Sequence, residues 1–159
     1  MEFSTDKSAI CWLQVVSDGR DSPFKSKVFD HVLVDAPCSG LGVLHRRPDS
    51  RWRIREKDLD NLARLQLELL HSASHLVKEG GTLTYSVCTV TSQETTKVAK
   101  ILESQFTNLR PQKMTHENWR NFGNGLQILP HDFSTDGMTV FFTLPFSTVN
   151  SFDIFAPSS

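Results

Sequence analysis

The segment Val28-Phe-Asp-His-Val-Leu-Val-Asp35-Ala-Pro-Cys38-Ser-Gly40 decides the fold. The stretch from Val28 to Val34 is rich in aliphatic and β-branched residues, as in a strand of a parallel sheet that is buried on both faces. The run ends at Asp35, and a Pro-Cys-Ser-Gly turn follows it. We therefore expect a central strand whose carboxyl end carries carboxylate and thiol side chains.

Helical patterns follow this segment along the chain. Apolar residues recur at helical spacing from residue 58 to 79, and Gly80-Gly81 stops the pattern as a C′ glycine does. Residues 82–87 form a β-rich run. Thr91-Ser-Gln-Glu94 then has the form of a capping box before a second helix, whose apolar residues stand at 98, 101, 102 and 106.

Three further runs complete the predicted sheet. Residues 11–16 predict a first strand, closed by Ser17-Asp18-Gly19, and a loop-like stretch after Pro111 leads to strand candidates at 126–129 and 138–144. Helices between strands imply parallel neighbours, whereas the short link before the last strand predicts an antiparallel one. We expect an α/β fold with a mostly parallel sheet, helices on both faces and an antiparallel last strand.

Length, charge and cysteine count restrict the possible functions. The 159 residues suit about one domain, and 17 basic against 18 acidic residues give a formal charge of −1. Contact with a polyanion must therefore come from local clusters. Three cysteines without a C-x-x-C pair predict neither a disulfide framework nor a metal site. Without a signal-peptide core or a membrane-length apolar run, we expect a cytoplasmic protein with no membrane contact.

Two thiols follow neighbouring strands, where open α/β sheets bind ligands. Cys38 follows the strand at 28–34, and Cys88 lies between the strand at 82–87 and the next helix. Most free cysteines are small hydrophobic residues of the core. A thiol near a helix N-terminus is instead activated, because the helix dipole favours the thiolate. The spacing leaves both interpretations open.

Several motifs together resemble one known family. These motifs are the run from Phe29 to Leu44 with its D-A-P-C-S-G turn, Arg47-Pro-Asp, Leu65-Gln66, and the run from Gly80 to Thr89 with its S-V-C-T end. In these four places the sequence resembles the RsmB/NOP (Sun-type) RNA cytosine-5 methyltransferases, especially the bacterial ribosomal RNA type. The similarity extends from about Asp18 to Leu144. It implies a Rossmann-like fold that uses S-adenosylmethionine as its cofactor.

The resemblance also implies roles for the strand-end residues. Cys88 would attack C6 of cytosine, so that C5 can accept a methyl group, and Cys38 would assist proton removal from C5 and release of the adduct. Asp35 would hydrogen-bond the N3/N4 edge of the base. The reverse assignment stays open, because DNA cytosine methyltransferases use the cysteine of a Pro-Cys turn as nucleophile. Cofactor contacts are implied for Asp18, Asp35 and Pro37, although an Asx turn with Gly19 explains Asp18 as well.

A basic loop at residues 45–57 is the candidate RNA contact. It holds six of the 17 basic residues, with Trp52 among them. Guanidinium groups suit phosphates, and an indole can stack on an unpaired base, so we expect RNA, and ribosomal RNA in particular, as the partner. A solvated charged loop is the alternative interpretation. The candidate RNA-binding residues are Arg46, Arg47, Arg51, Trp52 and Arg53.

The sequence departs from the family pattern before Asp18. No Gly-rich cofactor loop, no ribose-binding acidic residue and no RNA-binding domain is recognisable, so we interpret residues 1–159 as the C-terminal part of a methyltransferase catalytic domain that lacks the first strands. Two functions remain: an RNA cytosine-5 methyltransferase represented by this part, or a truncated, non-enzymatic remnant that binds RNA or a partner. We expect the chain alone to bind S-adenosylmethionine weakly or not at all.

Overall fold

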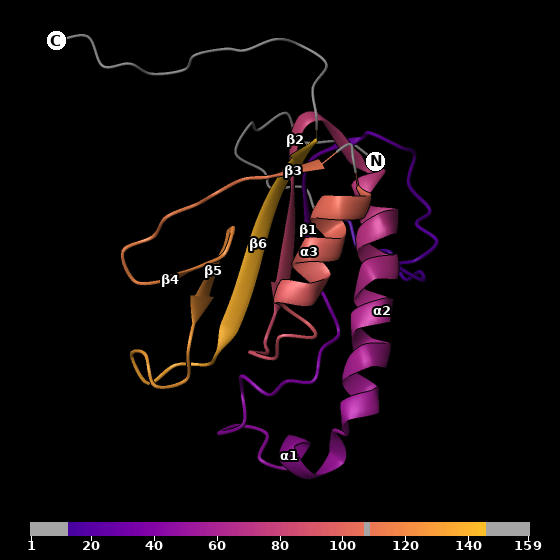
Figure 1. The fold of residues 1–159 in the computed structure, drawn as a ribbon. Coiled ribbons are helices and arrows are strands. Elements are labelled where there is room, and N and C mark those ends of the chain that lie inside the picture. Colours follow the sequence, from indigo (N-terminus) through magenta and orange to yellow (C-terminus); the bar gives the residue numbers. More distant parts are fainter. Residues whose placement is uncertain (1–12, 107–108, 146–159) are drawn as a thin grey trace, which may run out of the picture.

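The computed structural model describes residues 13–106 and 109–145 as one sheet with helices packed against it (Figure 1). The described strands are β1 Phe29–Asp35, β2 Val77–Val87, β3 Leu109–Pro111, β4 Arg120–Phe122, β5 Gly125–Ile128 and β6 Met138–Pro145. The described helices are α1 Ser50–Arg53, α2 Glu56–Ser74 and α3 Thr96–Gln105. The expected strands at 126–129 and 138–144 are thus confirmed as β5 and β6, whereas the short β3 and β4 were not predicted.

The strand order is β1-β2-β6-β5-β4, and β3 also pairs with β6. β1 and β2 are parallel, joined by a crossover that contains α1 and α2, while β6 is antiparallel to β2, β3 and β5. The α/β fold and the antiparallel last strand are therefore confirmed. The parallel part of the described sheet is smaller than expected, because the links among β4, β5 and β6 are too short for parallel crossovers.

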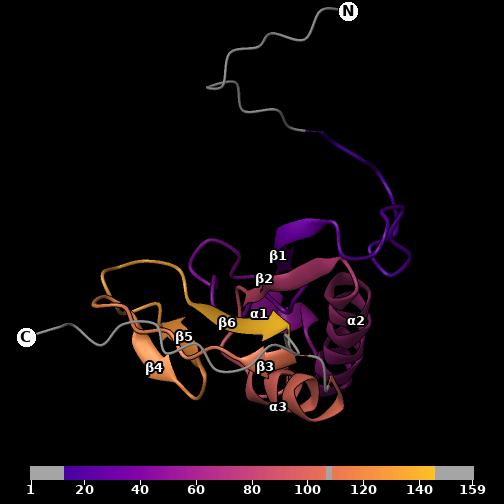
Figure 2. The ribbon, with the colours of Figure 1, turned by 90° about the horizontal axis from the view of Figure 1, so that it is seen from above.

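Helices cover one face of the sheet. Figure 2 shows α2 and α3 on the same side, and the core lies between them and the sheet. The prediction of helices on both faces is wrong for residues 13–106 and 109–145, whose two long helices pack against each other. The most buried core side chains are Leu70, Leu83, Tyr85, Val87, Val98 and Leu102.

The predicted helix at 58–79 has different ends. It begins at Glu56, because the Asp58 carboxylate accepts the Arg55 N–H and caps the first turn. It ends at Ser74 instead of 79, because the carbonyls of His75 and Leu76 accept N–H groups of residues 27–29. The chain then enters β2 directly, and the glycine pair lies inside that strand, where β1 and β2 shift register.

The predicted capping box at 91–94 is also wrong. Helix α3 begins at Thr96, with Thr95 as its N-cap and no side-chain cap bond. Glu94 does not cap the helix, because its carboxyl group turns inward and is fully buried. The apolar face expected at residues 98, 101, 102 and 106 is confirmed for Val98, Leu102 and Phe106, which are buried, whereas Ile101 is only half-buried.

The first part of the chain does not form the expected strand. Residues 13–16 belong to no strand, and Leu13 and Val16 are 81% and 96% exposed; residues 11 and 12 lie outside the described part. No described strand pairs with the outer edge of β1, so residues 13–16 have no ladder to join. For the same reason the strand expected to be buried on both faces is an edge strand, with Leu33 65% exposed.

Candidate functional site

The two parallel strands bring the predicted thiols together. Asp35 of β1 lies opposite Ser86 of β2, and the Ala36 N–H extends the ladder to the Ser86 carbonyl at 3.0 Å. Both strands therefore end at the same level, and the turns that follow place Cys38 Sγ 3.0 Å from Cys88 Sγ. The prediction that the two cysteines lie in one cleft is confirmed.

The thiols border a cavity of about 570 Å³ at the carboxyl ends of the strands. Both cysteines are half-buried, and Asp35, Pro37 and Arg47 line the same cavity. A cavity of this size accommodates a nucleobase and its sugar, and sites of this kind lie where α/β sheets bind ligands. The thiols are therefore not sealed in the core and can meet one ligand.

The contact between the two sulfurs shifts the pKa values of Cys88 and Cys38 in opposite directions. The pKa of Cys88 is lowered to about 7, mainly by the hydrogen bond from Cys38 and to a smaller extent by the nearby charge of Arg47, while burial and the charge of Asp35 act in the opposite direction. The same hydrogen bond, together with burial, raises the pKa of Cys38. The thiolate is therefore favoured at Cys88 and disfavoured at Cys38.

Backbone bonds hold the turn after β1 against the turn after β2. The Gly42 N–H donates to the Cys88 carbonyl at 3.1 Å, and the Gly137 N–H donates to the Gly42 carbonyl at 2.8 Å. A Cβ at Gly42 would lie 2.3 Å from the Gly137 oxygen and 2.9 Å from the Cys88 oxygen. The close approach of three loops at this point therefore requires glycine.

A buried polar cluster lies beneath the thiols. Gln66 of α2 is fully buried, and its Nε2 donates to the Pro37 carbonyl at 3.0 Å. The Tyr85 hydroxyl donates to Gln66 Oε1 at 2.9 Å and to the Glu94 carbonyl at 2.7 Å. Gln66, which belongs to the family resemblance seen in the sequence, here ties its helix to the Pro-Cys turn. Glu94 was misread as a capping residue.

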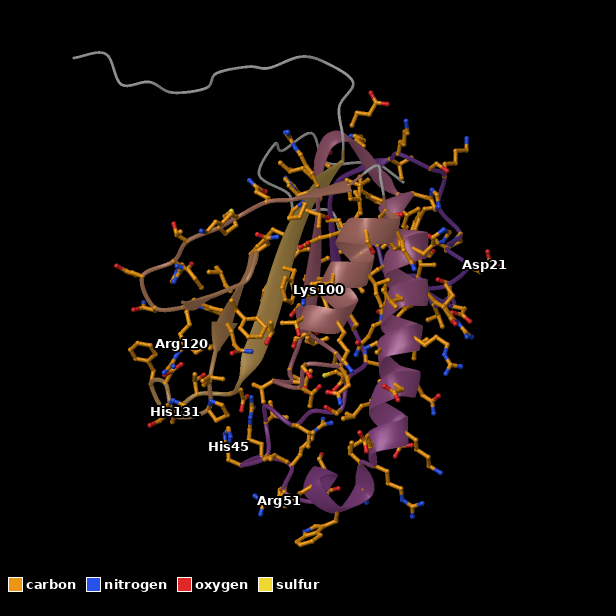
Figure 3. All side chains as sticks on the ribbon, in the orientation of Figure 1. Asp21, His45, Arg51, Lys100, Arg120 and His131 are labelled. Carbon is orange, nitrogen blue, oxygen red and sulfur yellow. The ribbon has the colours of Figure 1, made fainter. Side chains whose placement is uncertain are left out.

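The predicted RNA-contact residues lie beside the cavity and beyond it. Arg46 and Arg47 line the cavity, and Arg46 is bound to Asp136 of the loop before β6. Arg51, Trp52 and Arg53 form α1 and are exposed, with Trp52 83% exposed. Figure 3 shows His45, Arg51, Arg120 and His131 in the lower half of the view, toward the end of the molecule that carries α1. Arginine and histidine side chains thus gather around the end at which β1 and β2 terminate.

Two of the three predicted cofactor residues, Asp35 and Pro37, line a second cavity of about 560 Å³ on the open side of β1, whereas Asp18 does not line it, although both of its chain neighbours do. Asp35 and Pro37 line both cavities. Asp18 is not free, because its carboxylate accepts the Arg20 N–H at 2.9 Å and the Arg20 guanidinium at 2.7–3.1 Å, which lowers the pKa of Asp18 to about 2. The Asx turn proposed for Asp18 as the alternative is therefore present, with Arg20 as the donor.

The described residues contain no group of three or more histidine, cysteine and acidic side chains arranged to hold a metal ion. None of the described helices is long and apolar enough to cross a membrane.

Comparison with known proteins identifies relatives for most of the chain. The family 16S rRNA methyltransferase RsmB/F matches residues 6–143. The probable ribosomal RNA small subunit methyltransferase B of Bacillus subtilis (strain 168) is 41% identical over 123 residues, which are 74% of this chain and 28% of the relative. The enzyme named ribosomal RNA small subunit methyltransferase B of Pectobacterium atrosepticum is 38% identical over 122 residues, 76% of this chain and 28% of that protein.

Solved structures share the fold. The structure of PH0851 superposes with a TM-score of 0.77 and 31% identity, over 82% of this chain and 30% of that one. NSun6 from Pyrococcus horikoshii, solved with SFG, superposes with a TM-score of 0.66 and 25% identity, over 82% of this chain and 34% of that one. The chain thus spans between a quarter and a third of the length of these relatives.

Proposed function

The chain belongs to the 16S rRNA methyltransferase RsmB/F family, and on this premise we propose that it carries the thiol half of an active site that methylates C5 of cytosine in RNA, with ribosomal RNA as the substrate. Residues 1–159 are then a part of the catalytic domain of a cytoplasmic enzyme. One observation carries the proposal: two cysteine sulfurs lie 3.0 Å apart at the border of a base-sized cavity.

The proposed reaction begins with Cys88. With a pKa of about 7, a large share of Cys88 is thiolate at neutral pH. Addition of this thiolate to C6 of cytosine breaks the C5–C6 double bond and makes C5 electron-rich, which an unactivated aromatic carbon is not. Asp35 lines the same cavity and is assigned the contact with the N3/N4 edge of the base. Bound S-adenosylmethionine supplies an electrophilic methyl group for C5.

Cys38 is assigned the second half of the reaction. Its pKa is raised mainly by the hydrogen bond to Cys88. Once Cys88 is bonded to C6 as a neutral thioether, that cause disappears, and Cys38 can lose its proton to water. The Cys38 thiolate then takes the proton from C5, the C5–C6 double bond forms again, and Cys88 leaves as thiolate.

The residues present suit one wall of a cofactor site. Phe24, Leu33 and Leu69 give the second cavity an apolar surface that fits a flat ring, and Asp35 and Pro37 connect it with the thiol cavity. The relative solved with SFG, an analogue of S-adenosylmethionine, supports this class of cofactor. The exposed edge of β1 implies that the remaining contacts come from outside the described residues.

The basic loop is assigned the RNA backbone. Arg47 stands at the thiol cavity, and Arg51, Trp52 and Arg53 extend from it on α1. Guanidinium groups beside the thiol cavity can bind the phosphates that flank the base, while Trp52 can stack on an unpaired base. Arg46 is committed to Asp136 and holds the loop before β6 against the basic loop.

The two cysteines provide the test. The chain is combined with the remaining part of the Bacillus subtilis relative, incubated with S-adenosylmethionine and small-subunit ribosomal RNA, and examined by denaturing electrophoresis. Cys88→Ala should abolish both methylation and covalent adduct. Cys38→Ala should allow methyl transfer and accumulate a protein–RNA adduct, because release needs the C5 proton removed. An adduct trapped by Cys88→Ala would reverse the roles of the two cysteines. Unchanged methylation in both variants would contradict the proposal and favour the alternative, a non-enzymatic remnant that binds RNA or a partner.

A further inference from the structure

We propose that Glu94 is the positioning residue of the thiol pair: its buried carboxyl group joins the residue after Cys38 to the residue after Cys88 and so sets the distance between the two sulfurs. The inference extends the proposed function to a residue that touches neither the base nor the cofactor cavity.

The contacts of Glu94 are directed at the two cysteine turns. Oε1 accepts the backbone N–H of Ser39 at 2.8 Å, and Oε2 accepts the Ser39 hydroxyl at 2.6 Å. Oε2 also accepts the hydroxyl of Thr91 at 2.9 Å and that of Thr89 at 3.2 Å. Ser39 directly follows Cys38, and Thr89 directly follows Cys88. One side chain therefore holds both turns at the positions next to the sulfurs.

The surroundings of Glu94 fix the carboxyl group itself. Gln66 Nε2 of α2 donates to Oε1 at 3.1 Å, and the Tyr85 hydroxyl donates to the Glu94 backbone carbonyl at 2.7 Å. Glu94, Gln66 and Tyr85 are all at most 1% exposed. Hydrogen bonds in such a buried setting are stronger than in water, and an unpaired donor there is costly. The cluster is therefore a rigid support that reaches from the helix to both turns.

The donor set explains why the residue is a glutamate. Five donors converge on two oxygens, and a carboxylate is the side chain that only accepts. Two of these donors, the Ser39 N–H and the Gln66 amide, cannot reverse their role and both point at Oε1. The three hydroxyls at Oε2 can rotate and accept instead. A glutamine at this position can thus keep the bridge in part, whereas an alanine removes it.

The bridge has a chemical consequence at the thiols. Their 3.0 Å contact is the largest cause of the lowered pKa of Cys88. If the two turns separate, Cys38 no longer donates to Cys88, and the Cys88 pKa rises toward the ordinary thiol value of about 8.5. Glu94 thus controls the reactivity of a sulfur that it does not touch.

The test measures alkylation of Cys88 by iodoacetamide against pH in the full 159-residue chain, followed by mass spectrometry of the Cys88 peptide. Glu94→Ala should raise the midpoint by at least one pH unit, which lowers the thiolate fraction at pH 7 about fivefold. Glu94→Gln should give a smaller shift. A matched control is Leu102→Ala, a buried core change without hydrogen bonds to either turn; it should lower the melting temperature and leave the midpoint unchanged.

The same substitution in a chain that lacks Cys38 shows whether the effect of Glu94 on Cys88 depends on the thiol pair. In a Cys38→Ala chain, the Cys88 midpoint is already raised, and Glu94→Ala should shift it no further. A wild-type midpoint in folded Glu94→Ala, an equal shift in Leu102→Ala, or a full shift that persists without Cys38 would overturn the proposal. If Glu94→Ala does not fold, the shift of Glu94→Gln decides alone. The measurement needs neither RNA nor cofactor. The positioning role of Glu94 can therefore be disproved while the proposed methylation stands, and the methylation can be disproved while the role of Glu94 stands.

Discussion

The carboxyl end of β1 and its outer edge differ in how many contacts the described residues make there. At the carboxyl end, the thiol turns are held by Glu94, by backbone bonds through Gly42 and by Gln66 of α2. Along the outer edge, Leu33 is exposed and residues 13–16 join no strand. The site of the proposed covalent chemistry is therefore supported within the chain, while the described residues form only part of the proposed cofactor site.

The difference teaches that the two sites need separate tests. The thiol cavity is bordered by residues from both strand ends and the basic loop, so its properties should be measurable in the isolated chain. The second cavity is open along β1, and its walls are mainly apolar. The proposed thiol site and the proposed cofactor site thus lie on two sides of a single strand, and each of the following experiments addresses one of them.

The largest expected effect is a loss of affinity for the cofactor in the chain alone. The described residues supply one wall of the second cavity, and the Asp18 carboxylate is engaged by Arg20. We expect the chain alone to bind S-adenosylmethionine with a dissociation constant of about 1 mM or weaker, some 4 kcal/mol short of micromolar binding. Isothermal titration calorimetry measures this value. A micromolar constant would mean that the open side of β1 is a complete site.

A pair of glycine substitutions compares the two sides in stability. At Gly42 an added Cβ meets two backbone oxygens, which cannot move away, so Gly42→Ala should cost about 2–3 kcal/mol of unfolding free energy. At Gly19 it meets the end of the Leu69 side chain, which can rotate, and Gly19→Ala should cost under about 1 kcal/mol. Urea unfolding of both variants gives the two values. Equal costs would show that the open side is packed as tightly as the thiol turns.

The features that the sequence predicted are those that local patterns contain. The strand candidate at β6, the helical spacing of α2 and the strand-end cysteines are all visible within a few residues, and each was found. Parallel strands that are joined by one crossover end at the same edge of a sheet, so the proximity of Cys38 and Cys88 also followed from local patterns.

The features that were missed depend on distant partners. Thr91-x-x-Glu94 has the pattern of a capping box, but Ser39, which binds the carboxyl group, lies 55 residues away. The helix stop expected at Gly80-Gly81 is part of β2, because the Asp30 carbonyl approaches Gly81 too closely for a side chain. The burial of β1 depends on its neighbouring strands, which no pattern within residues 28–34 reveals.

Removal of the Cys38 thiol should reduce the reactivity of Cys88, by a factor smaller than the effects expected above for cofactor affinity and for Gly42. Cys38→Ala removes the hydrogen bond that is the main cause of the low Cys88 pKa. The alkylation midpoint of Cys88 should therefore rise from about 7 toward about 8.5, and the thiolate fraction at pH 7 should fall about 15-fold. Below the wild-type midpoint both chains lose reactivity, because the thiolate is protonated. An unchanged midpoint would remove the argument that Cys38 activates Cys88.

The smallest effect should come from the exposed edge. Leu33 is 65% exposed on β1, so Leu33→Thr gives up little buried surface, and a β-branched residue suits a strand; the expected cost is under about 1 kcal/mol. Leu83 lies on the adjacent strand β2 and is 1% exposed, so the same change there should cost about 2–4 kcal/mol. Urea unfolding of the two variants measures both. If Leu33→Thr costs as much as Leu83→Thr, then the edge of β1 is covered in solution by something beyond the described residues, and the second cavity is more complete than its described walls indicate. A small cost leaves the edge open, which is the state that the weak binding of cofactor requires.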